Sequence, residues 1–225
     1  QIYYVLGRFD RARELNERAL IIWKQHLKNN HANFAVTYSN LGKLAHQEKD
    51  YEGALRQYEK AHEIIQTKFG AFHPNLGASF FNLAEAMRHL NDLPEAEMNY
   101  RASLDVTRET FGSDHPDIIL GMHKLARVME MQGKNDEATK MYRTVLANAD
   151  DHLPHLSSAY LELLKDLRTF YAATNNQRMS IGVERRIERL LKTLPEDKRA
   201  IAEKALTQMP DSAPSLEATG NPKDD

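Results

Sequence analysis

Apolar residues recur along most of the chain at alternating spacings of three and four, which is the pattern of amphipathic helices. One such stripe runs from residue 34 to residue 47 and another from residue 51 to residue 69, with Glu48-Lys49-Asp50 between them. Gly70 directly follows the second stripe, as is typical just past the end of a helix. Together these segments predict an antiparallel helical hairpin.

The same pattern returns every 42 residues, which identifies an internal repeat. Aligned columns at one spacing indicate an array of hairpins in which each unit packs on its neighbours. Small residues in these columns would let two helices approach closely, and the tyrosines would fill the space between hairpins. The columns comprise Leu41, Leu83, Leu125 and Leu167; Gly42, Ala84 and Ala126; Ala12, Ala54, Ala96 and Ala138; Tyr58, Tyr100 and Tyr142; and His73-Pro74 with His115-Pro116.

These columns resemble the tetratricopeptide repeat (TPR), whose commonest version has a period of about 34 residues. A period of 42 with a Phe-Gly-x-x-His-Pro link, at 69–74 and 111–116, resembles the kinesin-light-chain type. The resemblance covers roughly residues 1–194 and implies an all-α fold, a right-handed superhelical solenoid of antiparallel helical hairpins with a C-terminal capping helix. In one copy the matching residues are Tyr38, Leu41, Gly42, Ala45, Ala54, Tyr58 and Ala61.

The period also divides the chain into segments. We expect a partial repeat at about 1–32, regular repeats at 33–74, 75–116 and 117–152, a divergent repeat at 153–194, a capping helix at 195–209 and a disordered acidic tail at 210–225. The fifth copy diverges because Arg168, Ser180 and Glu184 replace the small residue, the alanine and the tyrosine. Since the first copy begins inside its leading helix, we interpret the sequence as a fragment of a longer protein.

Composition excludes several classes of function. The 225 residues include no cysteine, which excludes disulfides, thiolate metal sites and a cysteine nucleophile. The 30 Lys and Arg against 32 Asp and Glu give a net charge of −2, so no overall field attracts nucleic acid or anionic lipid. No apolar run approaches the ~20 residues of a membrane span. No secretory signal is visible, and we expect a cytoplasmic protein without nucleic-acid or membrane partners.

No catalytic motif or cofactor fingerprint is present, so we predict a non-enzymatic protein without cofactor or metal. His31, His73 and His115 form one column, and packed helices lie about 8–10 Å apart. They cannot share one zinc ion whose ligands lie at about 2.0–2.1 Å, and we interpret them as residues that begin helices. The cluster of residues 150–152 with His155 is interpreted as helix-terminal chemistry rather than a metal site.

Ligand binding in a stacked hairpin array is expected on its concave face. The TPR resemblance implies that the first helix of each hairpin lines that face. Asn40 and Asn82 share a column and can both donate to and accept from a peptide backbone, and the basic residues there can bind a carboxylate. Each of them can also be an ordinary solvated residue. The candidate peptide-binding residues are Asn40, Lys43, Phe81, Asn82, Arg88, His123, Lys124 and Arg127.

The first hypothesis is therefore an adaptor that binds an extended, partly acidic peptide in a concave groove. The alternative is a regulatory or sensor tail of a larger enzyme, with a nucleotide-binding, kinase or protease domain on its N-terminal side. A third hypothesis is self-association through the incomplete N-terminal repeat.

Overall fold

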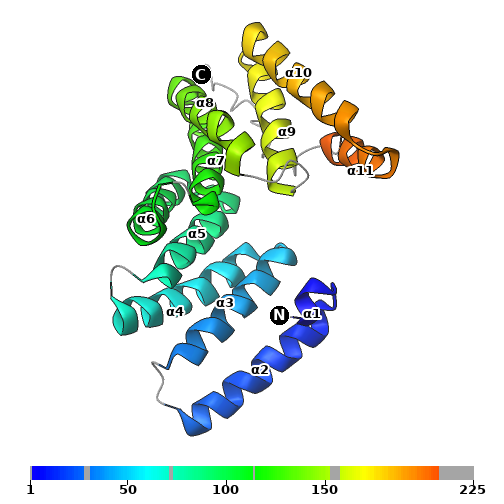
Figure 1. The fold of residues 1–225 in the computed structure, drawn as a ribbon. Helices are drawn as coiled ribbons and strands as arrows, with labels where there is room; N and C mark the ends of the chain where they lie inside the picture. Colours follow the sequence, from blue (N-terminus) through cyan, green and yellow to red (C-terminus); the bar gives the residue numbers. More distant parts are fainter. Residues whose placement is uncertain (1, 28–30, 71–72, 114, 153–157, 208–225) are drawn as a thin grey trace, which may run out of the picture. The chain divides into compact units, whose positions relative to one another are not determined.

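The computed structural model describes residues 2–27, 31–70, 73–113, 115–152 and 158–207, and it divides into two compact units, residues 1–148 and 149–225 (Figure 1). These described residues contain helices and no strand, and none of their helices is long and apolar enough to cross a membrane. The first unit holds α1 (Ile2–Val5), α2 (Phe9–His26), α3 (Ala32–Gln47), α4 (Tyr51–Phe69), α5 (Pro74–His89), α6 (Leu93–Phe111), α7 (Pro116–Met131) and most of α8 (Asn135–His152). The second holds α9 (Ser158–Ala173), α10 (Gln177–Thr193) and α11 (Glu196–Thr207).

Consecutive helices of the first unit pair into hairpins. Helix α3 packs along α4 and α5 along α6, while α4 also contacts α5 and α6 contacts α7, so each hairpin lies against the next (Figure 1). The predicted all-α array of helical hairpins is confirmed.

The turn inside each hairpin has the same backbone conformation in all five copies. One residue in each of these turns has a positive φ, which is the left-handed conformation that commonly ends a helix. Its recurrence in the fifth copy shows that the divergent repeat keeps the hairpin turn although its core positions have changed. These residues, spaced by 42, are Gly7 (69°), Lys49 (65°), Asn91 (62°), Gly133 (75°) and Asn175 (54°).

The Phe-Gly-x-x-His-Pro link joins one hairpin to the next. His73 Nδ1 accepts a hydrogen bond from the backbone N–H of residue 75 at 3.2 Å, and His31 and His115 cap α3 and α7 in the same way. The His73 ring stacks on Phe69 with centroids 4.3 Å apart. Gly70 ends α4 at φ 77°. The interpretation of the histidine column as helix-starting residues is confirmed.

The small-residue columns lie in the core of the first unit. Ala54 and Ala96 are 0% exposed, and Tyr58 and Tyr100 are 4% and 0% exposed. A Cβ added to Gly42 would lie 2.5 Å from Tyr58 Cε1, so the tyrosine fills the space that the missing side chain leaves. Close helix approach and tyrosine filling therefore depend on each other.

In the second unit, α9 and α10 form a hairpin and α11 packs against both. Ala202 and Leu206 of α11 are buried. Arg168, which stands where earlier copies have a small residue, donates a hydrogen bond to the carbonyl oxygen of Leu206 near the end of α11. The large residue therefore holds the terminal helix. His155, the side chains of residues 150–152 and the predicted tail lie outside the described residues.

Candidate functional site

Two cavities lie along the first helices of the hairpins in the first unit. The larger, of about 560 Å³, lies among α1, α2 and α3, and its walls include Asn40 and Lys43. The smaller, of about 210 Å³, lies among α3, α5, α6 and α7, and its walls include Lys43, Phe81 and Asn82. Because Lys43 borders both, the two cavities are neighbouring parts of one surface, which we call the groove. Four of the predicted site residues meet there.

The polar side chains of the groove differ in whether they already have a partner within the protein. Lys43 is exposed and Asn82 half-buried, and within the described part of the chain neither side chain has a hydrogen-bond or ion-pair partner. Asn40, in contrast, donates from Nδ2 to Asn16 Oδ1 at 3.3 Å. Lys43 and Asn82 are therefore available to a ligand, whereas Asn40 must first release Asn16.

Phe81 forms an apolar wall of the smaller cavity. Its half-buried ring packs edge-on against Tyr100 with centroids 5.5 Å apart. Pro74 and Leu120 contribute further apolar surface. The smaller cavity thus combines an apolar wall with an amide, a cation and the Asp117 carboxylate at its border.

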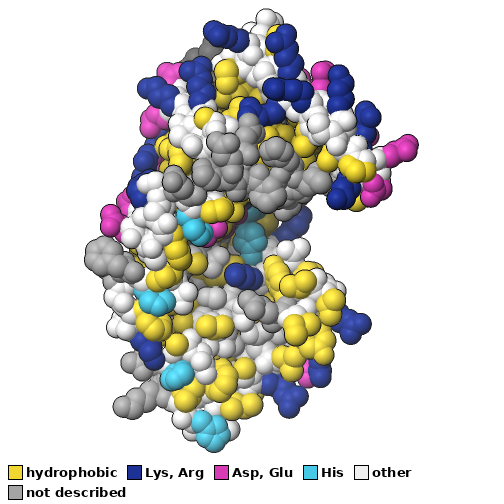
Figure 2. All heavy atoms as spheres, viewed as in Figure 1, with side chains coloured by type: hydrophobic (Ala, Val, Ile, Leu, Met, Phe, Trp, Pro, Cys, Tyr) yellow, Lys and Arg dark blue, Asp and Glu magenta, His cyan; other side chains and the backbone are white. Residues whose placement is uncertain are grey.

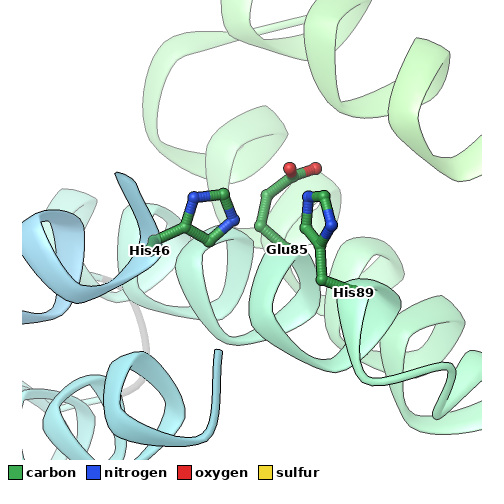
Figure 3. A group of neighbouring side chains, drawn as sticks. All are labelled: His46, Glu85 and His89. Carbon is green, nitrogen blue, oxygen red and sulfur yellow. The ribbon is translucent and has the colours of Figure 1, made fainter. Parts of the chain in front are cut away.

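A polar cluster lies at the C-terminal ends of α3 and α5. His46 comes from α3, and Glu85 and His89 come from α5; the two rings and the carboxylate lie around one space (Figure 3). Arg88 Nη2 lies 3.1 Å from Glu85 Oε2 and 2.7 Å from His89 Nε2. The Tyr100 hydroxyl donates to Glu85 Oε1. We call His46, Glu85, Arg88 and His89 the α3–α5 cluster.

Burial and charge shift the pKa values of this cluster. Burial, and then the Arg88 charge, lower the pKa of His89 to about 4, and burial also lowers the pKa of His46. Burial alone would raise the pKa of Glu85, but Arg88, Lys124 and the Tyr100 hydrogen bond outweigh it and lower that pKa to about 2. At neutral pH the cluster therefore holds two neutral imidazoles, a carboxylate and a guanidinium.

A family model for the tetratricopeptide repeat matches residues 1–67, 33–106 and 78–151. The chain belongs to the tetratricopeptide repeat family. No curated protein sequence matches this TPR chain. Among solved structures, it is similar to a Podosopora anserina protein described as a kinesin light chain with nearly identical TPR-like repeats, at TM-score 0.70 and 21% identity over 84% of this chain and 89% of that one.

BtubC (BKLC) of P. vanneervenii is similar at TM-score 0.69 and 16% identity, covering 98% of the TPR chain and 84% of BtubC. YrrB, a TPR protein with an unusual peptide-binding site, is similar at TM-score 0.54 and 15% identity, covering 90% and 87%. At these identities the likeness establishes the fold, which is that of kinesin-light-chain-like TPR proteins.

Two predicted site residues of the TPR chain are not free groove residues. His123 is only 2% exposed, so the expectation that it faces a ligand is wrong. Its ring lies 6.3 Å from that of Tyr142, and the pair stands one repeat after the Phe81–Tyr100 pair. The Arg88 side chain is 11% exposed and engaged with Glu85, so the expectation of a solvent-facing cation is also wrong.

Lys124 and Arg127 of α7 are half-buried, both have interactions within the chain, and neither borders the two cavities. The α3–α5 cluster was not predicted from the TPR sequence. Its histidines fall in different columns, since His46 aligns with Arg88 and His89 aligns with Gln47. The sequence feature that could have predicted the cluster is the separation of His46 and His89 by about one repeat, since residues one repeat apart lie on successive hairpins that pack together.

Proposed function

We propose that this TPR protein is an adaptor that binds an extended, partly acidic peptide segment of another protein in the groove. The observation that carries the proposal is the pair Lys43 and Asn82 at the border of the smaller cavity, whose side chains have no partner among the described residues. A TPR fold is a protein-binding scaffold, and the fold shared with YrrB is consistent with peptide binding.

Each wall of the smaller cavity fits a different part of such a peptide. The Asn82 amide can donate to a backbone carbonyl and accept from a backbone N–H. The exposed Lys43 ammonium favours a carboxylate close by. The surface of Pro74, Phe81 and Leu120 can cover one apolar side chain of the ligand. An apolar residue flanked by Asp or Glu is therefore the expected ligand pattern.

The test is selection from a peptide library displayed against the full chain, followed by titration of the selected peptides. Asn82→Ala and Lys43→Glu are each expected to weaken binding about tenfold, because each removes one polar contact to the ligand. Lys140→Glu, at an exposed position on α8, makes the same charge change away from the groove and should leave binding unchanged. Equal binding by the wild type and both groove variants would refute the groove as the site.

A second observation favours self-association at the N-terminal hairpin. In Figure 2, apolar side chains gather over the α1–α2 end of the first unit. Ile2, Val5 and Leu6 are 76%, 82% and 62% exposed, and all three border the larger cavity. Contiguous apolar surface of this kind marks interaction sites, and we propose that a second copy of the chain covers it.

Sedimentation velocity over a range of protein concentrations tests the second proposal. The wild type is expected to form a dimer as concentration rises, and Val5→Glu should remain monomeric because it would bury an unpaired charge. Val36→Glu is the matched control, since Val36 is 57% exposed on α3 and does not border the cavity. A wild type that stays monomeric at every concentration would contradict self-association.

A further inference from the structure

We propose that the α3–α5 cluster is a binding site for a divalent first-row transition metal ion, with His46, Glu85 and His89 as its ligands. Glu85 and His89 are four residues apart on α5 and therefore share one face of that helix. His46 reaches the same space from α3 of the preceding hairpin (Figure 3). The three ligands thus come from two repeats that pack on each other.

The distances suit a site that closes around an ion. One ligand atom of each residue lies within 4.8 Å of the other two. Tetrahedral Zn²⁺ with bonds of about 2.0–2.2 Å places its ligand atoms roughly 3.3–3.6 Å apart. The side chains therefore need to move inward by about 1 Å, within the reach of small changes in their torsion angles.

Hydrogen bonding also favours metal binding. His46 Nε2 is buried and has no hydrogen-bond partner, a costly state that a metal bond would relieve. Tyr100 holds the Glu85 carboxylate as an outer partner holds a metal-bound carboxylate.

The guanidinium of Arg88 already places a positive charge in this cluster. Its Nη2 contacts both the Glu85 carboxylate and His89 Nε2, two of the groups that would bind the metal. The Arg88 Nε is buried without a partner, so the guanidinium is incompletely satisfied there. A metal ion must displace the Arg88 guanidinium from His89 Nε2 and Glu85 Oε2. The positive charge of Lys124 also opposes the binding of a metal ion. The site therefore selects ions that bind imidazole strongly, such as Zn²⁺, Ni²⁺ or Cu²⁺, over Mg²⁺ and Ca²⁺.

The test is calorimetric titration of the metal-free full chain with zinc chloride at pH 7. One Zn²⁺ per chain is expected for the wild type. Arg88→Gln should bind about tenfold more tightly, because it removes the competing cation while keeping a donor for Glu85. His46→Ala and His89→Ala should each bind about 100-fold more weakly. His26→Ala, at an exposed position on α2, is the matched control and should bind as the wild type does.

Circular dichroism of the metal-free variants checks that each remains folded. Histidine ring NMR signals of the wild type, followed at substoichiometric Zn²⁺, identify the ligands without any substitution; those of His46 and His89 should change first. Wild-type affinity in both histidine variants would overturn the proposal. So would a lack of Zn²⁺ binding by both the wild type and Arg88→Gln, or first changes at other histidines.

Discussion

Tyr100→Ala is expected to lower the free energy of unfolding of the first unit by about 3–5 kcal/mol, the range for removing a large aromatic side chain from a core. Tyr100 is 0% exposed and supports the Phe81 ring. Its loss would create a cavity between α5 and α6 and remove the hydroxyl that donates to the Glu85 carboxylate. Urea denaturation of the full chain, followed by circular dichroism, measures the change.

Two further substitutions separate the contributions of Tyr100. Tyr100→Phe keeps the ring and loses only the hydrogen bond to Glu85, so its cost should be about 1–2 kcal/mol. Tyr38→Ala, at a half-buried tyrosine on α3 outside the repeated tyrosine column, is the comparison for ring removal. If Tyr100→Ala cost no more than Tyr38→Ala, the tyrosine column would not be the structural anchor that its burial indicates.

The hairpins could be predicted from the sequence because their determinants lie close together along the chain. The periodic stripe at residues 51–69 became α4 with the same bounds. The histidines before α3, α5 and α7 each accept a hydrogen bond from an N–H only two residues away. The Gly42–Tyr58 contact lies within one hairpin, and each of the two residues belongs to a column that repeats every 42 residues.

The exposure of individual groove residues could not be predicted in the same way, because it depends on how the side chains around each of them pack. A helical stripe placed Phe81 and His123 in the same column. The structure leaves Phe81 half-buried at the cavity wall, whereas His123 is buried near Tyr142. Arg88 was likewise expected on the groove stripe, but its guanidinium forms an ion pair with the carboxylate of Glu85 one turn earlier. Pairing within one helix turn competes directly with ligand binding.

The α3–α5 cluster could not be predicted from the aligned columns of the repeat. Alignment at 42 residues compares equivalent positions, but packed hairpins also bring together positions that are not equivalent. His46 and His89 are 43 residues apart, and their rings lie 4.9 Å apart beside Tyr51. Contacts of this kind depend on the relative placement of two helices, which the period does not specify.

The cluster should also make the first unit less stable in acid. The pKa of His89 is about 4 in the folded chain against an ordinary 6.5, so the unfolded chain takes up a proton first as the pH falls. The contribution of His89 to stability is therefore fully present above pH 6.5 and is lost progressively between pH 6.5 and 4. For Glu85, with a pKa of about 2 against 4.5, the corresponding loss runs from pH 4.5 to 2. Both groups therefore lower the free energy of unfolding as the pH falls.

Urea midpoints measured at pH 7.5, 6.0 and 5.0 test the histidine contribution apart from that of Glu85. The wild-type free energy of unfolding should fall by about 1–2 kcal/mol between pH 7.5 and 5.0, a value reduced for the partial exposure of His89. His89→Gln should remove much of this dependence, because the group that binds the extra proton in the unfolded chain is gone. His26→Gln, at an exposed position, should retain it. An unchanged slope in His89→Gln would show that the acid sensitivity arises elsewhere, in His46 or His62, whose pKa values burial also lowers.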